Sequence, residues 1–177
     1  MPALGKSPVM KDDRGLFFPL KLDGSWVQSN ISVSKRWTFR GLHHQRGETA
    51  QTKQISVLTG SILDFLVDLR TGHFQEAYFF KLYPGDQILI PKGFAHGFLA
   101  LEDDSMIQYV VDNPYSPSTE ISFDWKSNET VKELILAEVG SADNLRMSEK
   151  DMAGVPITPI YAEDVAYYNK TNHSVQL

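Results

Sequence analysis

YPGDQILIPKGFAHGFLALEDDSMIQYVV, residues 83–111, is the stretch that decides the fold. The Gly-Asp pair at 85–86 and Pro-Lys-Gly at 91–93 are turn sequences, because glycine supplies positive φ and proline fixes φ near the value that turns need. Three short apolar runs lie between and after these turns, at residues 87–90, 96–101 and 106–111. Their length and β-branched content favour strands over a helix. A strand, a tight turn and then His96 at the mouth of the next strand indicate a small β-barrel with a histidine against its cavity.

Short apolar runs separated by turn residues continue on both sides of this stretch. Further strands are expected at residues 16–18, 25–34, 37–45, 51–58, 61–69, 77–82 and 121–125, and residues 1–12 predict a loose arm or an edge strand. The runs 51–58 and 61–69 predict a hairpin that turns at Thr59-Gly60. About ten strands at a spacing of roughly 8–12 residues are typical of an all-β sandwich or barrel. Helical character is confined to residues 129–139, ETVKELILAEV.

Composition excludes several classes of protein. The 177 residues, 42% of them hydrophobic and 22% charged, predict a single globular domain over 1–177. No apolar run approaches the roughly 18 residues that span a bilayer, and no leader sequence begins the chain. The absence of cysteine excludes disulfides, thiolate metal sites and cysteine nucleophiles. A net charge of −5 without basic blocks argues against nucleic-acid binding, and a cytoplasmic location is expected.

Two adjacent histidines, His43 and His44, lie in one expected strand. Neighbours in a strand point to opposite faces, so both can enter one cavity only if a bulge intervenes. Lys53 shares a strand face with apolar residues, and it is either extended along the rim or held near an anion. Tyr109, taken alone, is a core or boundary tyrosine. Asp151 is equally consistent with a helix cap and a surface charge.

A metal site is one interpretation of His96, which follows G-x5-P-x-G-x2-H and so resembles the second half of the cupin metal motif. The first half of that motif offers two histidines separated by one residue, whereas here Gln45 stands where the second would be. Glu48 is a possible oxygen ligand, but Ala100 occupies the usual asparagine position. Because a catalytic site normally needs three well-spaced ligands, the sequence does not favour a metal.

Taken together, fragments spread over most of the chain resemble dTDP-4-dehydrorhamnose 3,5-epimerases. They occur in the order found in that family: Asp13-Arg14-Gly15-x-Phe17, Gln28-x-Asn30, Arg40-Gly41-Leu42-His43, Lys53, Val67-Asp68-Leu69-Arg70, Pro91-x-Gly93-Phe94-Ala95-His96-Gly97-Phe98, Tyr109, Tyr115 and Ser148-x-Lys150-Asp151. The resemblance covers residues 13 to about 152, and RGLH combined with GFAHGF is its most specific part. It leaves a C-terminal extension from about residue 153.

This resemblance implies a cupin-type jelly-roll β-barrel with a few short C-terminal helical segments, usually assembled as a homodimer. The implied substrate is a nucleotide-diphosphate 4-keto-6-deoxy sugar, and no metal or organic cofactor is implied. The implied catalytic residues are His43 as general base, Asp151 as its orienting carboxylate, Lys53 at the developing enolate and Tyr109 as the acid on the other face of the sugar. The implied contacts to nucleotide, diphosphate and sugar, some of them reaching across the dimer, come from Arg14, Phe17, Gln28, Asn30, Arg40, His96 and Tyr115.

These residue types suit proton abstraction beside a ketone. Histidine titrates near neutral pH, and an O–H donor on the opposite side can return the proton with inversion. Two alternatives remain, a non-catalytic cupin module that binds a sugar nucleotide or glycan and a metal-dependent cupin enzyme. Pro19 stands where many family members have a glutamate associated with nucleotide binding, so the nucleobase stays open. The sequence also leaves open whether C3, C5 or both carbons are inverted.

Overall fold

The computed structural model describes the backbone of residues 3–6, 10–12 and 15–17 and the full chain of residues 25–160. The strands are β1 (Ala3–Lys6), β2 (Met10–Asp12), β3 (Gly15–Phe17), β4 (Gln28–Ser34), β5 (Phe39–Gln45), β6 (Lys53–Thr59), β7 (Ile62–Asp68), β8 (Ala77–Leu82), β9 (Asp86–Ile90), β10 (Phe94–Ala100), β11 (Ser105–Val111) and β12 (Glu120–Ser122). The helices are α1 (Glu129–Val139) and α2 (Glu149–Met152), with 3-10 turns at Gly47–Thr49, Trp125–Ser127 and Ala142–Asn144.

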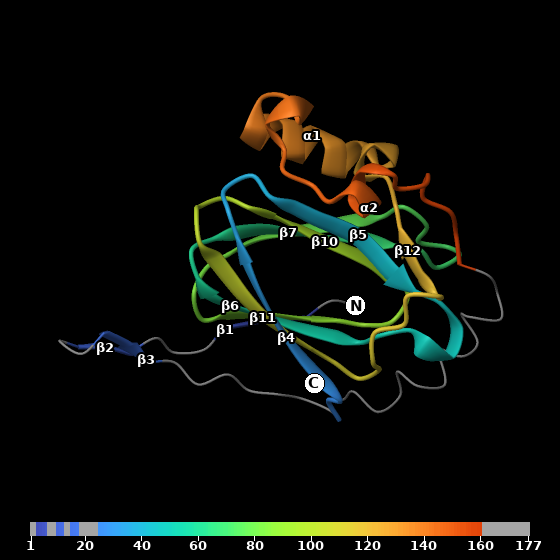
Figure 1. Ribbon diagram of the computed structural model, residues 1–177. Helices are drawn as coiled ribbons and strands as arrows, with labels where there is room; N and C mark the ends of the chain where they lie inside the picture. Colours follow the sequence, from blue (N-terminus) through green and yellow to red (C-terminus); the bar gives the residue numbers. More distant parts are fainter. Residues whose placement is uncertain (1–2, 7–9, 13–14, 18–24, 161–177) are drawn as a thin grey trace.

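Two antiparallel sheets of five strands face each other and form the barrel in Figure 1. The first has the order β1-β9-β6-β11-β4, and the second has the order β12-β5-β10-β7-β8. Strands β2 and β3 pair only with each other and lie to one side of the barrel. The all-β jelly-roll predicted from the sequence is therefore confirmed, and β1 is the edge strand expected near the N-terminus.

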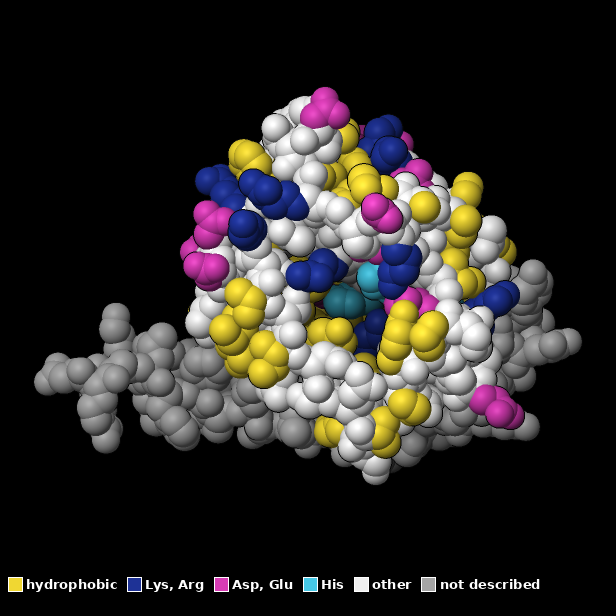
Figure 2. Space-filling model, viewed as in Figure 1, with side chains coloured by type: hydrophobic (Ala, Val, Ile, Leu, Met, Phe, Trp, Pro, Cys, Tyr) yellow, Lys and Arg dark blue, Asp and Glu magenta, His cyan; other side chains and the backbone are white. Residues whose placement is uncertain are grey.

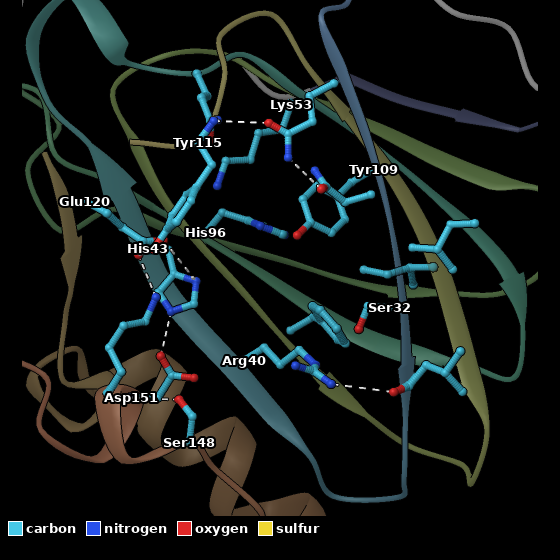
Figure 3. A pocket seen from close by; sticks show the side chains of 18 residues that line it. Ser32, Arg40, His43, Lys53, His96, Tyr109, Tyr115, Glu120, Ser148 and Asp151 are labelled. Carbon is cyan, nitrogen blue, oxygen red and sulfur yellow. Dashed lines mark hydrogen bonds and ion pairs between the residues drawn. The ribbon is translucent and has the colours of Figure 1, made fainter. Parts of the chain in front are cut away.

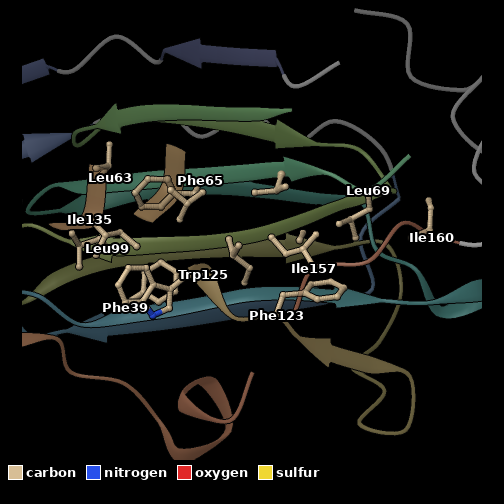
Figure 4. Packing of buried hydrophobic residues seen from close by; sticks show 14 of the residues in the cluster. Phe39, Leu63, Phe65, Leu69, Leu99, Phe123, Trp125, Ile135, Ile157 and Ile160 are labelled. Carbon is tan, nitrogen blue, oxygen red and sulfur yellow. The ribbon is translucent and has the colours of Figure 1, made fainter. Parts of the chain in front are cut away.

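The larger apolar core lies between the second sheet and α1, outside the barrel (Figure 4). Strand β7 supplies Leu63, Phe65 and Val67 to it, at the alternate positions that one face of a strand presents. Ile157 and Ile160 complete this core with 6% and 7% of their surface exposed. The described part of the C-terminal extension is thus packed into the fold.

A second apolar cluster lies between the two sheets. It contains the inward residues of β7 and β10, such as Leu66, Phe94 and Phe98, together with Ile88 and Ile107 of the other sheet. Burying an aliphatic or aromatic side chain of this size contributes about 1.5–3 kcal/mol. Phe98 and Ile107 belong both to this cluster and to the lining of the cavity described below, so the apolar interior borders that cavity directly.

The predicted hairpin at Thr59-Gly60 is wrong. Strand β6 pairs with β9 and β11, whereas β7 pairs with β8 and β10, so the chain crosses from one sheet to the other at this turn. Gly60 has φ +69°, and a Cβ at this position would lie 2.5 Å from Oγ of Ser105. The glycine is needed for this crossing, because a side chain would be both strained and in collision.

The C-terminal helix agrees with its predicted bounds. Asn128 accepts a hydrogen bond from the backbone N–H of Val131 at 3.1 Å, and Gly140 ends the helix with φ +77°. The predicted strand 121–125 is shorter than expected, because β12 covers Glu120–Ser122 and a 3-10 turn begins at the buried Trp125. In the part of the chain that is described, every helix is too short or too polar to cross a membrane.

Candidate active site

A cavity of about 670 Å³ lies between the two sheets, next to the inner apolar cluster. Figure 2 shows its mouth as a hollow with histidine inside and basic and acidic side chains around it. Its size is ordinary for a small-molecule site. The lining residues come from both sheets and from α2: Gln28, Asn30, Ile31, Ser32, Val33, Arg40, His43, Gln51, Lys53, His96, Phe98, Ile107, Tyr109, Tyr115, Glu120, Ser148, Lys150 and Asp151.

A β-bulge in β5 brings Arg40 and His43 to the same wall of the cavity. His96 pairs with His43 but Phe98 pairs with Arg40, so β5 has one residue more than β10 in this interval. The bulge depends on Gly41, whose φ is +130° and whose hypothetical Cβ would lie 2.5 Å from Cα of Gly97. A side chain at Gly41 would therefore push β5 away from β10 and displace His43.

His44, the neighbour of His43, does not line the cavity. It is buried, and its Nδ1 lies 3.3 Å from the carbonyl oxygen of Phe94. Burial lowers the pKa of His44 to about 4, because the charged imidazolium loses its hydration. The expectation that adjacent histidines cannot both enter the cavity is correct, because the bulge precedes this pair and does not separate it.

The buried His44 makes the fold sensitive to acid. Between pH 6.5 and 4 the unfolded chain binds a proton at His44 that the folded chain does not bind, so the free energy of unfolding falls as pH falls. We expect a loss of about 2–3 kcal/mol at pH 4.5 from this group. His44→Phe should lessen the loss in urea unfolding at pH 7.5 and 4.5, while the exposed His73→Ala control should keep it. Equal pH dependence in wild type and His44→Phe would contradict the assignment.

His43 and Asp151 form a polar pair in the cavity, marked by a dashed line in Figure 3. Nε2 of His43 lies 2.6 Å from Oδ1 of Asp151, which is 5% exposed. Burial alone would raise the pKa of Asp151, but the hydrogen bonds from His43 and Ser148 and the nearby positive charges lower it overall. An ionised carboxylate only accepts hydrogen bonds, so Nε2 of His43 donates to Asp151, and in the neutral imidazole the lone pair lies on Nδ1.

Lys53 extends from β6 in the opposite sheet and lines the same cavity. Burial lowers the pKa of Lys53 to about 8, and the negative charges of Glu120 and Asp64 oppose this shift. The side chain is thus a cation at neutral pH that loses its charge in the mildly alkaline range. Such a desolvated ammonium is a strong electrostatic donor to an oxygen anion.

Tyr109 lies on β11, beside Lys53 and on the sheet opposite His43. Figure 3 shows its ring turned into the cavity. Burial raises the pKa of Tyr109 above its ordinary value, although the charge of Arg40 opposes this. The phenol therefore keeps its proton at neutral pH, on a wall different from the one that holds the imidazole.

Five of the seven predicted substrate-binding residues line the cavity: Gln28, Asn30, Arg40, His96 and Tyr115. Nε2 of His96 lies 2.7 Å from Oδ1 of Asp64, a carboxylate with no exposed surface. Arg14 and Pro19 lie outside the described residues, and Phe17 is described only as backbone in β3. Their predicted contacts stay predictions.

Glu120 is the main cavity residue that the sequence analysis missed. It lies on the short edge strand β12, where its Oε2 accepts hydrogen bonds from Nζ of Lys150 at 2.6 Å and from the hydroxyl of Tyr115 at 2.9 Å. Its proximity in sequence to Tyr115 and its place before an expected strand were the available signals. Lys150 and Ser148 belong to the matched Ser-x-Lys-Asp motif, but no role followed from that motif alone.

The geometry gives no support to the metal interpretation. Gln45 is buried and donates hydrogen bonds to the carbonyl oxygens of Thr49 and Pro114, so it faces away from the cavity. Across residues 25–160, whose side chains are described, histidine and carboxylate groups nowhere gather into a set of three that could hold a metal ion.

The chain matches one protein family over most of its length. The family profile described as dTDP-4-dehydrorhamnose 3,5-epimerase matches residues 4–158. The dTDP-4-dehydrorhamnose 3,5-epimerase of Escherichia coli (strain K12) is 36% identical over 157 residues, which cover 81% of this chain and 82% of the relative. The protein of the same name from Methanothermobacter thermautotrophicus is 34% identical over 86% of this chain and 89% of its own.

Solved structures agree with these matches. The epimerase of Bacillus anthracis, crystallised with TDP and PPi bound, has a TM-score of 0.73 and 33% identity over 90% of this chain and 94% of its own. The Legionella pneumophila enzyme in complex with dTDP-4-keto-L-rhamnose has a TM-score of 0.76 and 28% identity over 90% and 93%. Fold, cavity and sequence lead to one conclusion, that this chain belongs to the dTDP-4-dehydrorhamnose 3,5-epimerase family.

Proposed function

We propose that the protein inverts one or two carbons beside the 4-keto group of a nucleotide-linked 4-keto-6-deoxy sugar. The observation that carries the proposal is the placement of His43 and Tyr109 on opposite sheets around one cavity, with Lys53 lining it beside Tyr109. The activity of the family is isomerisation, and an epimerase needs a base, an anion-stabilising group and an acid. In this proposal His43 is the base, Lys53 is the anion-stabilising group and Tyr109 is the acid.

In the proposed reaction, Nδ1 of His43 removes the hydrogen from the carbon next to the ketone. The C–H electron pair becomes the enolate double bond, and the ketone electrons move to O4 as an oxyanion. Lys53 stabilises this oxyanion, while Asp151 holds the imidazole and compensates its positive charge. General-base catalysis contributes about 10²–10⁴-fold, and a single oxyanion donor contributes a comparable factor.

Inversion requires that the new C–H bond forms on the other face of the sugar. Tyr109 donates its phenolic proton there, and the enolate electrons return to carbon as the ketone is restored. A protonated tyrosine suits this task, because burial keeps its pKa above the ordinary value. Since the base and the acid belong to different strands, a planar enolate between them is approached from both sides.

We propose a nucleoside diphosphate as the carrier of the sugar. The complexes of two relatives, one with TDP and PPi and the other with dTDP-4-keto-L-rhamnose, support this class of ligand. Arg40 provides a guanidinium in the cavity, and such groups bind phosphate through two parallel hydrogen bonds. The predicted contacts of Arg14 and Phe17 belong to this part of the proposal.

A homodimer and a cytoplasmic location complete the proposal. Val27, Ile31 and Val33 lie in or beside the edge strand β4 with 60%, 66% and 50% of their surface exposed, and a second copy would cover them. The absence of cysteine suits a reducing compartment. The alternative of a non-catalytic binding module is less well supported, because binding alone does not require a carboxylate-backed imidazole opposite a phenol.

Incubation with a nucleotide 4-keto-6-deoxy sugar in deuterated water tests the function. Solvent deuterium should appear at C3, C5 or both, as measured by mass spectrometry and proton NMR. Tyr109→Phe should still exchange the proton on the His43 side, whereas net inversion should fall about 10²-fold or more because the opposite acid is missing. Tyr83→Phe, a change at a half-exposed tyrosine outside the cavity lining, is the control. Lack of incorporation with every nucleotide tested would contradict the proposed function.

A further inference from the structure

Glu120 is a partly buried carboxylate whose contacts the proposed mechanism does not yet use. Its side chain is 12% exposed, and its Oε1 lies 4.0 Å from Nδ1 of His43, the nitrogen opposite Asp151. At this distance the two atoms share no hydrogen bond, so the lone pair of Nδ1 stays available to a substrate hydrogen. The ring of His43 is thus flanked by two carboxylates, one bonded to Nε2 and one held at a distance from Nδ1.

Two neighbouring donors hold Glu120 away from the base. Nζ of Lys150 and the hydroxyl of Tyr115 both bind its Oε2, at 2.6 and 2.9 Å. Burial alone would raise the pKa of Glu120, but Lys150, His43 and Tyr115 lower it overall, so the group is ionised at neutral pH. Without Lys150, the Tyr115 hydroxyl would be the one remaining hydrogen-bond donor to Oε2 of Glu120 among the described residues.

The charge of Glu120 also reaches the side chains on the facing sheet. It opposes the lowering of the Lys53 pKa and adds to the raising of the Tyr109 pKa, while Lys150 has the opposite influence on both. The charged and titratable groups around Glu120, His43 and Lys53 come from several elements: Asp151 and Lys150 of α2, Tyr115, Arg40 of β5, Asp64 of β7, His96 of β10 and Tyr109 of β11.

We propose that Glu120 is a positioning residue for the proposed epimerisation, because Lys150 and Tyr115 fix its negative charge where it supports both His43 and Lys53 without blocking the base. Its charge offsets the imidazolium that forms when His43 takes a proton from carbon, and it helps Lys53 to remain an ammonium facing the enolate oxygen. The catalytic consequence of this inference rests on the proposed function, whereas the effect of the Glu120 charge on Lys53 does not.

The test compares the pH dependence of kcat/KM, which reports the groups of the free enzyme, in variants that change one charge each. In the wild type we expect the alkaline limb near pH 8, where Lys53 loses its proton. Glu120→Gln should lower kcat about tenfold and move this limb down by about one pH unit, whereas Lys150→Met should move it up by a smaller amount. Glu120→Asp should restore the wild-type position of the limb in part, because the charge returns.

Glu76→Gln is the matched control, because Glu76 also contacts a histidine and a tyrosine hydroxyl, His73 and Tyr78, but lies on the exposed surface outside the cavity. It should leave the alkaline limb where it is. The inference would be overturned if Glu120→Gln and Lys150→Met both reduced the rate without moving the limb, since a purely structural role predicts that result.

A measurement without substrate separates this inference from the proposed function. The ¹³Cε signal of Lys53, assigned by its absence in Lys53→Arg, is titrated in ¹³C-lysine-labelled wild type and variants. Opposite shifts of its midpoint in Glu120→Gln and Lys150→Met support the inference even if a nucleotide sugar is never turned over. An unchanged midpoint refutes it even if the wild type is an active epimerase.

Discussion

The His43→Ala variant is expected to lose solvent-deuterium exchange into a 4-keto sugar by about 10³-fold or more, the largest effect of any single substitution in the cavity. His43 is the side chain whose Nδ1 is placed to take the proton, and its Nε2 is committed to Asp151 at 2.6 Å. Exchange at carbon needs removal of the proton by the base and return of a solvent deuteron from the same side, so it reports on the base without requiring the proton of Tyr109.

Removal of the imidazole also affects the fold, because Asp151 would be left as a buried carboxylate without its main partner. Leaving a buried charge unpaired costs several kcal/mol, so His43→Ala has to be checked by circular dichroism and urea unfolding. His43→Gln keeps an amide donor for Asp151 while it removes the base, and it should be folded but inactive. His73→Gln, at an exposed histidine that also contacts a carboxylate, is the control and should exchange normally.

A wild-type exchange rate in folded His43→Gln would show that another group is the base. His96 would then be the next candidate, since its Nε2 is likewise held by a carboxylate, that of Asp64. Repeating the assay with His96→Gln would decide between the two histidines, because loss of exchange in that variant would identify His96 as the base.

The sequence predicted the strands better than it predicted their pairing. The alternation in β7 placed Leu63, Phe65 and Val67 on one face, and the structure packs that face against the helical side. The turn at Gly60 was recognised, but a glycine turn occurs both in hairpins and where a chain changes sheets. Which of the two forms depends on the pairing of β6 with β9 and β11, a long-range property that local turn chemistry does not contain.

The same limit applies to the cavity. The resemblance selected His43, Lys53, Tyr109 and Asp151, and the structure brings all four to one cavity. The bulge that orients His43 depends on contact between two glycines 56 positions apart, Gly41 and Gly97, which strand periodicity cannot predict. Glu120 was missed because its strand has only three residues, too few to show an alternating pattern.

Replacing Lys53 should lower the activity but raise the stability of the protein. The cation that would stabilise the enolate has a pKa lowered by burial to about 8, so keeping it charged at neutral pH costs folding free energy. Lys53→Met fills nearly the same volume without a charge. We expect kcat to fall by about 10²–10³ while the protein becomes about 2 kcal/mol more stable at pH 7.

The pH dependence of this stability difference gives the sharper measurement. Between pH 8 and 10.5 the unfolded chain holds a proton on Lys53 that the folded chain has released, so wild-type stability rises with pH in this window. Urea unfolding at pH 7 and 10 should therefore show a stability gain for Lys53→Met that shrinks at the higher pH. Lys81→Met, at an exposed lysine of β8, should change neither activity nor this dependence. A Lys53→Met protein that is less stable than wild type at pH 7 would show that neighbouring charges fully compensate the buried ammonium. The role of Lys53 as a desolvated electrostatic donor to the enolate would then have to be abandoned.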